Sequence, residues 1–200
     1  MDALLWIDIQ NDFCPGGALA VREGDQVVPI ANAWAKKFEL VIATQDFHPA
    51  SHLSFAINHP GKHEYEVIEL DGLPQVLWPP HCVQGTAGCE LHPALELARI
   101  TKVFQKGTDA RIDSYSGFFD NGHRKATGLG EYVLAQGVKR VWVLGLATDY
   151  CVKWTALDAR QLGLEVHVIE DGCRGVALQA EDVPNALAEL RAAGVIIERS

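Results

Sequence analysis

Three residues that could carry hydrolytic chemistry each stand at the end of a short apolar run. Asp8 lies in the first run, Lys106 follows the run at residues 103–105, and Cys151 follows VWVLGL at residues 141–146. A thiol attacks a carbonyl carbon once a neighbouring base has removed its proton, and a lysine can balance the charge of such a pair. If these side chains meet in the fold, their types predict a cysteine nucleophile with an acid/base partner.

Each of these residues also has a structural interpretation. A cysteine in the first turn of a helix, as expected for Cys151, feels the positive end of the helix dipole, which lowers the thiol pKa. Backbone N–H groups at the same turn could hold an oxyanion. A buried structural cysteine is the alternative, and it suits Cys14 and Cys173 better, because neither lies at a clear strand-to-helix turn. Asp8 could instead bond loop backbone, and a lysine such as Lys106 is usually a solvated surface charge.

A second group of residues could bind a metal ion. Asp46 and His48 follow the second apolar run with one residue between them, so both side chains lie on the same side of an extended segment. His52 follows shortly after, and His81 lies in the sequence WPPHC. One carboxylate with two or three imidazoles suits Zn, Fe or Mn. The remaining histidines of this region do not stand in a comparable motif and are expected on the surface or in loops: His59, His63 and His92.

The elements that must position these residues alternate along the chain. Continuous apolar runs predict strands at residues 3–9, 40–44, 100–105, 141–146, 165–169 and 195–198. Helical patterns predict helices at residues 27–38, 130–136, 149–162 and 184–193. We therefore expect an α/β fold with three α/β/α layers around a mainly parallel sheet of about six strands. Its carboxyl edge would gather Asp8, Lys106 and Cys151.

One stretch does not follow this alternation. Residues 46–97 are rich in proline, glycine, histidine and aromatic residues, and a loop region of this length inside a compact domain is usually functional or disordered. Its composition favours function, so we expect a metal- and substrate-binding loop region at about 46–97. We expect residues 1–200 to form a single domain.

Composition narrows the class of protein. The chain has 200 residues, of which 48% are hydrophobic and 22% charged, as in soluble globular proteins. Its formal net charge of −9 and the absence of a basic stripe argue against a nucleic-acid partner. No segment resembles a signal peptide or a membrane span. Five scattered cysteines do not suggest a disulfide framework, which favours a cytoplasmic setting. The sequence does not decide between a monomer and a homo-oligomer.

Several blocks along most of the chain resemble the nicotinamidase group of the isochorismatase-like cysteine hydrolase superfamily. They are, in order, LLWIDIQNDFCPGGAL, TQDFHPASHLSF, LWPPHCVQGT, VFQKG, SYSGFFD and GLATDYCVKWTALDA. The order of the blocks is far more specific than any one of them. The resemblance implies the isochorismatase-like hydrolase fold and hydrolysis of nicotinamide to nicotinate and ammonia through a cysteine thioester. It also implies deamidation of pyrazinamide.

The resemblance further implies a role for individual residues. Asp8 matches the acid/base, Lys106 the lysine and Cys151 the nucleophile of the family, and the backbone N–H groups of Ala147 and Cys151 match its oxyanion hole. The Leu146–Ala147 peptide bond matches one that is cis in relatives. The resemblance implies one divalent transition metal ion (Zn, Fe or Mn), held by Asp46, His48 and His81. His52 is a weaker match to a fourth ligand of some relatives, because its spacing is short. Aromatic positions that line the substrate pocket are also matched: Phe13, Trp78 and Tyr115.

Two other functions remain open at this point. Another cysteine hydrolase of the superfamily could act on a ureido or carbamoyl compound, but such enzymes generally lack the metal loop. A non-catalytic metal-binding or redox-sensing protein could use Cys151 as a sensor thiol. The acid and the lysine that accompany this cysteine argue against the second alternative.

Overall fold

The fold is built on one sheet of six strands that all run parallel. The computed structural model describes residues 1–200, and its strand order is β5-β2-β1-β6-β7-β8. The strands are β1 (Asp2–Ile7), β2 (Leu40–Asp46), β5 (Lys102–Lys106), β6 (Arg140–Leu146), β7 (Glu165–Arg174) and β8 (Ile196–Glu198). Every neighbouring pair is parallel, so the prediction of a mainly parallel sheet of about six strands is confirmed.

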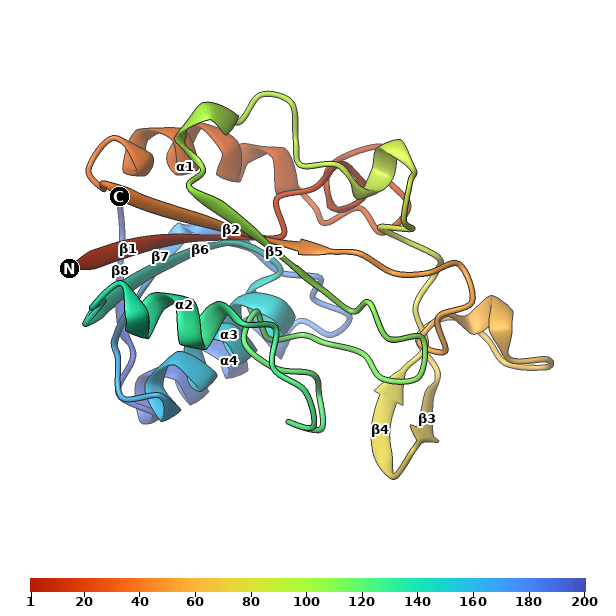
Figure 1. The fold of residues 1–200 in the computed structure, drawn as a ribbon. Coiled ribbons are helices and arrows are strands. Elements are labelled where there is room, and N and C mark those ends of the chain that lie inside the picture. The colour runs from red at the N-terminus through yellow and green to blue at the C-terminus, as the bar shows by residue number, and fades with distance from the viewer.

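Helices cover both faces of this sheet. They are α1 (Val27–Ala35), α2 (Leu129–Ala135), α3 (Lys153–Gln161) and α4 (Asp182–Ala192). Figure 1 shows α1 on one side of the sheet and the other three on the opposite side, with both termini at the same end. The predicted three-layer α/β/α arrangement is therefore confirmed. The inner strands β1 and β2 are buried almost throughout, which explains their unbroken apolar runs.

The helix expected to begin at Asp149 begins later than the sequence predicted. Residues Thr148–Val152 form one turn of π-helix, and α3 starts only at Lys153. Asp149 does not cap this helix, because its carboxylate accepts hydrogen bonds from the backbone N–H groups of Val176 and Ala177 at 2.9 and 2.8 Å. The wider π-turn therefore carries Cys151, and the expected first α-helical turn was wrong. The first helix is also shorter than predicted and ends at Ala35.

The loop region contains regular structure that the sequence analysis did not predict. Strands β3 (Val67–Leu70) and β4 (Leu73–Val76) pair antiparallel as a hairpin, which projects away from the main sheet in Figure 1. Asp71 and Gly72 form its turn with φ of 50° and 83°. An Asp-Gly pair between two short runs is a strong hairpin signal, so this element could have been read from the sequence.

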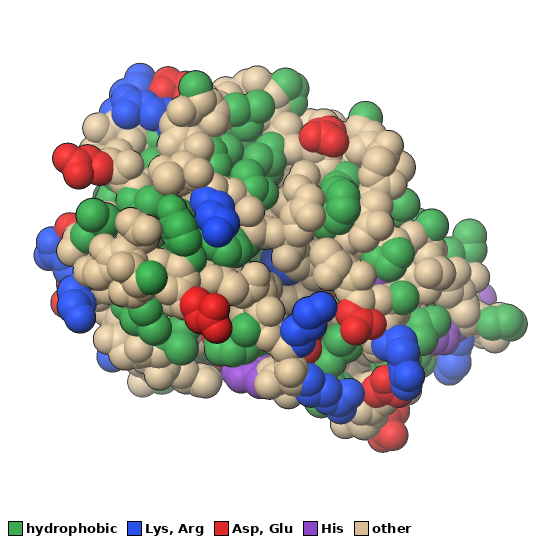
Figure 2. All heavy atoms as spheres, in the orientation of Figure 1, with side chains coloured by type: hydrophobic (Ala, Val, Ile, Leu, Met, Phe, Trp, Pro, Cys, Tyr) green, Lys and Arg blue, Asp and Glu red, His purple; other side chains and the backbone are tan.

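The core packs between the sheet and its helices as a cluster of 44 buried residues. Trp6 of β1 is among its largest fully buried side chains. No helix combines the length and apolar character needed to cross a membrane. On the face seen in Figure 2, lysine and arginine side chains alternate with acidic ones and form no continuous basic patch.

Candidate active site

The carboxyl ends of four neighbouring strands bring the predicted catalytic residues together. Asp8 directly follows β1, Asp46 and Lys106 end β2 and β5, and Cys151 lies beyond β6. The strand order places these four strands side by side, and Asp46 and Lys106 are register partners. Asp8 has a φ of 47°, so the chain turns sharply where the strand stops. All four side chains are buried.

Lys106 is the centre of this group. Its Nζ lies 2.9 Å from Asp8 Oδ2 and 2.6 Å from Asp46 Oδ1. The same ammonium donates to the backbone oxygen of Ser114 at 2.7 Å and lies 3.3 Å from Cys151 Sγ. One buried cation is thus shared by two carboxylates, one carbonyl and the thiol. Lys106 is therefore not a solvated surface lysine, because its side chain is buried among these partners.

Charge is distributed unequally between the two carboxylates. Burial opposes ionisation of both, yet Lys106 and His48 hold the pKa of Asp46 far below its usual value. For Asp8, burial and the nearby Asp46 charge outweigh Lys106, and its pKa is raised. The two acids raise the pKa of Lys106 well above its usual value despite burial. The lowered pKa favours the ionised form of Asp46, and the raised pKa favours proton uptake by Asp8.

The thiol of Cys151 does not have the lowered pKa that a helix N-terminus would give. Burial raises its pKa well above the usual value, and Asp8 adds to this effect while Lys106 opposes it. The sequence-based expectation was wrong because it considered only the helix dipole and not the burial of the sulfur. This cysteine carries its proton at rest, so a base is needed to make the thiolate.

Asp8 is held so that one of its oxygens can serve as that base. Thr44 Oγ1 donates to Asp8 Oδ1 at 2.6 Å and accepts from the Asp8 backbone N–H at 3.2 Å. Asp8 Oδ2 has no aligned hydrogen bond, although the Lys106 ammonium lies beside it. Titratable atoms of Asp8, Asp46 and Cys151 lie within 4.8 Å of one another. Asp8 Oδ2, paired only with the Lys106 ammonium, thus keeps the capacity to accept a proton.

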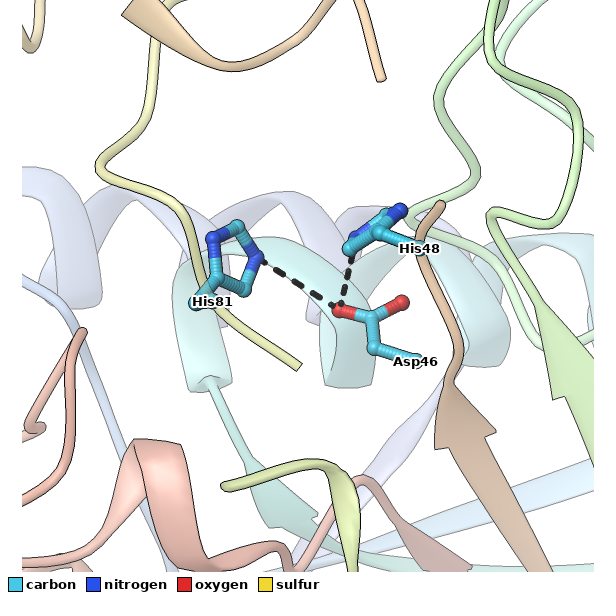
Figure 3. A group of neighbouring side chains, drawn as sticks. All are labelled: Asp46, His48 and His81. Carbon is cyan, nitrogen blue, oxygen red and sulfur yellow. Dashed lines mark ion pairs between the residues drawn. The ribbon is translucent and has the colours of Figure 1, made fainter. Parts of the chain in front are cut away.

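Asp46, His48 and His81 converge on one point beside this group (Figure 3). Asp46 Oδ2 lies 3.7 Å from His48 Nε2 and 3.9 Å from His81 Nε2. All three side chains are buried, and their candidate ligand atoms lie within 4.8 Å of one another. The structure therefore contains a candidate metal site of one carboxylate and two imidazoles.

The hydrogen bonds of the two imidazoles fit a metal ion. His48 Nδ1 faces the backbone oxygen of Gly107 at 2.9 Å, and His81 Nδ1 faces that of Pro79 at 2.8 Å. With Nδ1 protonated toward these carbonyl oxygens, each Nε2 would be available to a metal ion lying between it and Asp46, as in other histidine metal sites. His48 Nε2 is buried without a hydrogen-bond donor. Burial and His48 lower the pKa of His81 to about 4, which keeps its ring neutral as a ligand requires.

His52 lies beside this group but does not join it. Its ring centre is 4.4 Å from that of His48, and its possible ligand atoms group with His48 and Asp113. Its Nδ1 contacts Ser54 Oγ at 2.7 Å and accepts from the Ser54 backbone N–H at 3.1 Å. Its Nε2 is buried without a hydrogen-bond partner, so His52 keeps a free ligand atom beside His48, but that atom does not group with Asp46 and His81. The sequence analysis did not single out Asp113, a buried acid that accepts from Gln75 at 3.2 Å.

A small cavity connects the cysteine to the candidate metal site. It is lined by Cys151, Ala147, Asp46 and His81 and by the three aromatic residues that the sequence predicted, Phe13, Trp78 and Tyr115. Four further residues, which had no sequence signal, complete the lining: Leu19, Asp113, Tyr150 and Val176. Tyr150 precedes the cysteine, and its ring centre lies 4.9 Å from that of Trp78 at nearly a right angle. The Leu146–Ala147 peptide bond is cis, as the resemblance implied.

The largest hollow of the molecule lies elsewhere. This groove of about 850 Å³ runs along β5 and α2 and includes Lys102, Phe104 and Tyr132. It contains none of the buried acids, histidines or thiol of the cavity above. Because clusters of groups with displaced pKa values mark functional sites better than volume does, we place the candidate active site in the smaller cavity.

Gln10 is a supporting residue that the sequence analysis did not single out. Its side-chain amide donates to the backbone oxygens of Asp46 and Cys89 at 2.8 and 2.7 Å, and its Oε1 accepts from the Asp46 N–H at 2.9 Å. Both backbone groups of Asp46 are thus held by a residue of the segment that follows β1. Asp12 acts similarly and accepts from the N–H of Cys82, next to His81, at 2.7 Å. Nothing in the residue types alone distinguished these two from ordinary loop residues.

Comparison with known proteins agrees with this geometry. Residues 2–200 match the Isochorismatase domain family. The chain belongs to the isochorismatase family. It is 53% identical to the nicotinamidase of Escherichia coli over 199 residues, covering 98% of this chain and 93% of that protein. The structure of a nicotinamidase/pyrazinamidase of Acinetobacter baumanii superposes with a TM-score of 0.96 and 46% identity, covering 99% and 95% of the two chains.

Two further solved structures of similar proteins hold ligands. A pyrazinamidase of Pyrococcus horikoshii in complex with zinc has a TM-score of 0.81 and 36% identity, covering 100% of this chain and 99% of its own. A protein of L. infantum in complex with nicotinate has a TM-score of 0.87 and 38% identity, covering 100% and 92%. Family membership thus extends over the full length of the chain.

Proposed function

We propose that the protein is a nicotinamidase, which hydrolyses nicotinamide to nicotinate and ammonia and deamidates pyrazinamide by the same route. The observation that carries the proposal is an aromatic cavity lined by Cys151, Asp46 and His81, with the Asp8–Lys106 pair in contact with this group and His48 completing the candidate metal site. Full-length relatives named as nicotinamidases support the choice of substrate. We further propose that residues 1–200 act as one domain, with residues 46–97 supplying the metal and substrate contacts.

The reaction would begin with proton transfer from Cys151 to Asp8. The raised pKa of Asp8 makes this carboxylate a stronger base than an ordinary aspartate, and the raised pKa of the thiol explains why a base is needed. Lys106 lies 3.3 Å from the sulfur and would balance the thiolate as it forms. The sulfur then bonds to the carboxamide carbon, and the carbonyl oxygen becomes an oxyanion.

Backbone N–H groups of Ala147 and Cys151 would hold that oxyanion. Removing one such donor raises the barrier by about 2.7–4 kcal/mol in other hydrolases. Asp8 returns its proton to the amide nitrogen as the carbon–nitrogen bond breaks, which releases ammonia and leaves a thioester. Asp8 then takes a proton from water, the resulting hydroxide displaces the sulfur, and the thiol regains its proton.

Asp46, His48 and His81 would hold one divalent transition metal ion, and zinc in the similar pyrazinamidase supports this set. When bound, such an ion supplies a fixed positive charge that can orient a ring nitrogen of the substrate. Phe13, Trp78 and Tyr115 line the same cavity and would pack against the ring. The protein's own side chains thus place the carboxamide next to the thiol.

The alternative activities differ in what they require. A hydrolase of ureido or carbamoyl compounds needs the three catalytic residues but not a metal group beside an aromatic cavity. A redox sensor needs an accessible low-pKa thiol, whereas Cys151 is buried and its pKa is raised. Both observations favour the nicotinamidase.

Ammonia release separates these functions directly. Purified protein should release ammonia from nicotinamide and pyrazinamide with a kcat of about 1–10³ s⁻¹, the usual range for enzymes. N-carbamoyl amino acids should yield no ammonia under the same conditions. Turnover of the carbamoyl compound without turnover of nicotinamide would overturn the proposal.

A further inference from the structure

A second cavity lies behind the wall of the substrate cavity. It has a volume of about 190 Å³ and opens between the β3–β4 hairpin, the segment after β5 and helix α3. Tyr115 lines both cavities, but none of the catalytic residues or candidate metal ligands lines the second one. The proposed hydrolysis therefore leaves this cavity without a role.

The floor of the second cavity carries a carboxylate with an unused oxygen. Asp158 of α3 lines the cavity and is 1% exposed. Its Oδ1 lies 3.2 Å from His123 Nε2, whereas its Oδ2 makes no hydrogen bond of good geometry, although the Ser116 side chain lies close to the carboxylate. Burial raises the pKa of Asp158, although the nearby Ser116 and His123 oppose this rise. A buried carboxylate oxygen without a donor is unfavourable, so a ligand that brings an N–H group gains affinity there.

The rest of the lining favours a flat or apolar body. Trp154 is 41% exposed, and Leu73 and Pro74 add apolar surface from the hairpin. No lysine or arginine lines the cavity, and Asp158 is its only carboxylate. Lys153 lies 5.0 Å over the ring of Trp154 but forms an ion pair with Glu189 at 3.1 Å. The cavity therefore has no lysine or arginine that could pair with the Asp158 carboxylate.

His123 is the side chain that covers this carboxylate. Its side chain is 46% exposed, and its ring stacks on Phe119 with ring centres 4.8 Å apart. An exposed ring that makes one contact with Asp158 can be displaced by a cation that makes a charge-assisted hydrogen bond to the same carboxylate. The ligand would thus replace His123 as the partner of Asp158.

We propose that this cavity is a second small-molecule site, for a single-ring primary amine whose ammonium group donates to Asp158 and whose ring packs against Trp154. The volume accommodates one six-membered ring with a short side chain. The shared wall at Tyr115 would couple the two sites, since Asn121 of the second cavity accepts from the Tyr115 N–H at 2.9 Å. Occupation of the second site would then change the KM for the substrate more than kcat.

Benzylamine is a suitable probe, and benzyl alcohol is its neutral counterpart of the same size. Both are titrated calorimetrically into the metal-loaded protein with excess nicotinate present to occupy the substrate cavity. Benzylamine should bind at least about tenfold more tightly than benzyl alcohol, as expected for one charge-assisted hydrogen bond. Equal affinities of the two probes, or no binding of benzylamine at millimolar concentration, would overturn the proposal.

Two variants locate the binding. D158N keeps the shape of the side chain but removes its charge, and it should weaken benzylamine binding by about tenfold or more. W154A alters an exposed residue, so it should fold normally, and it should weaken binding several-fold. L134A, which removes an exposed apolar side chain on α2, is the matched surface control and should bind as the unaltered protein does. Unchanged binding in W154A together with D158N would refute the site, and ammonia release from nicotinamide without amine tests the catalytic proposal separately.

Discussion

The proposed catalytic residues at the sheet edge and the candidate metal ligands in the loop region are held in different ways. Asp8 and Cys151 follow strands β1 and β6, Lys106 ends β5, and the Lys106 ammonium contacts the other two side chains. His48 and His81 stand in irregular backbone, where single hydrogen bonds fix them. His48 N–H donates to the oxygen of Cys82 at 3.0 Å, for example, and its own oxygen accepts from Gln84 at 2.8 Å.

This difference indicates how each region responds to change. A regular sheet edge tolerates loss of a single side chain without losing its shape, so substitutions there should affect chemistry alone. In the loop region the same contacts set both the backbone and the ligands, so substitutions should affect metal affinity first. Asp46 belongs to both regions, because it ends β2, pairs with Lys106 and faces both imidazoles.

The largest expected effect is at the sheet edge. C151A should lower kcat/KM for nicotinamide by about 10⁴-fold or more, the scale seen when one member of a hydrolytic triad is removed. The free energy of unfolding and the metal content should change little. C173A is the matched control, because Cys173 is equally buried in β7 but outside the cavity, and it should retain activity. Comparable activity in the two variants would contradict the nucleophile assignment.

A smaller effect is expected in the loop region. H48A should bind metal more than about 100-fold more weakly, since even partners outside the ligand set change metal affinity by about 10–100-fold. Metal content after dialysis, measured by mass spectrometry, tests this. H59A serves as the control, because its ring bonds the oxygen of Leu53 at 2.7 Å and lies outside the ligand group. Stoichiometric metal in dialysed H48A would show that the ligand set is wrong.

Gln10 tests the connection between the two regions. Q10M keeps the side-chain volume but removes three hydrogen bonds, two of them to the backbone of Asp46, and should weaken metal affinity by about 10–100-fold. Q45M is a close control, because the Gln45 side chain is also buried and donates to the oxygen of Cys89 at 2.9 Å but makes no hydrogen bond to Asp46. If Q45M loses as much metal as Q10M, the effect arises from Cys89 and not from Asp46.

The smallest expected effect is a displacement of the pH profile. Asp8 must be ionised to accept the thiol proton, and its folded pKa is raised, so kcat/KM should fall with decreasing pH at a higher pH than an ordinary carboxyl would give. T44V removes the hydroxyl that bonds the ionised form and should move this acid limb to still higher pH. An unchanged acid limb in T44V would argue that another group governs the profile.

Local sequence patterns predicted much of the fold because each element bears its own signal. The unbroken apolar runs of β1, β2 and β6 and the glycines that follow α2 and α3 indicated an alternating α/β chain. The β3–β4 hairpin was missed although Asp71-Gly72 marks it, because the surrounding histidines and prolines were treated as one loop. The π-turn before α3 has no comparable signal, since it depends on how Asp149 binds the backbone after β7.

The sequence by itself determined the residue types of the site, their places after apolar runs and the family that the ordered blocks resemble. Only the tertiary structure decided how these residues act on one another. The thiol pKa is one example, because burial of Cys151 and the nearby Asp8 raise it, whereas the local sequence predicts that a helix dipole lowers it. The support of Asp46 by Gln10 is another. Burial and contacts between distant segments have no local pattern, since they arise only when strands far apart in the sequence pack side by side.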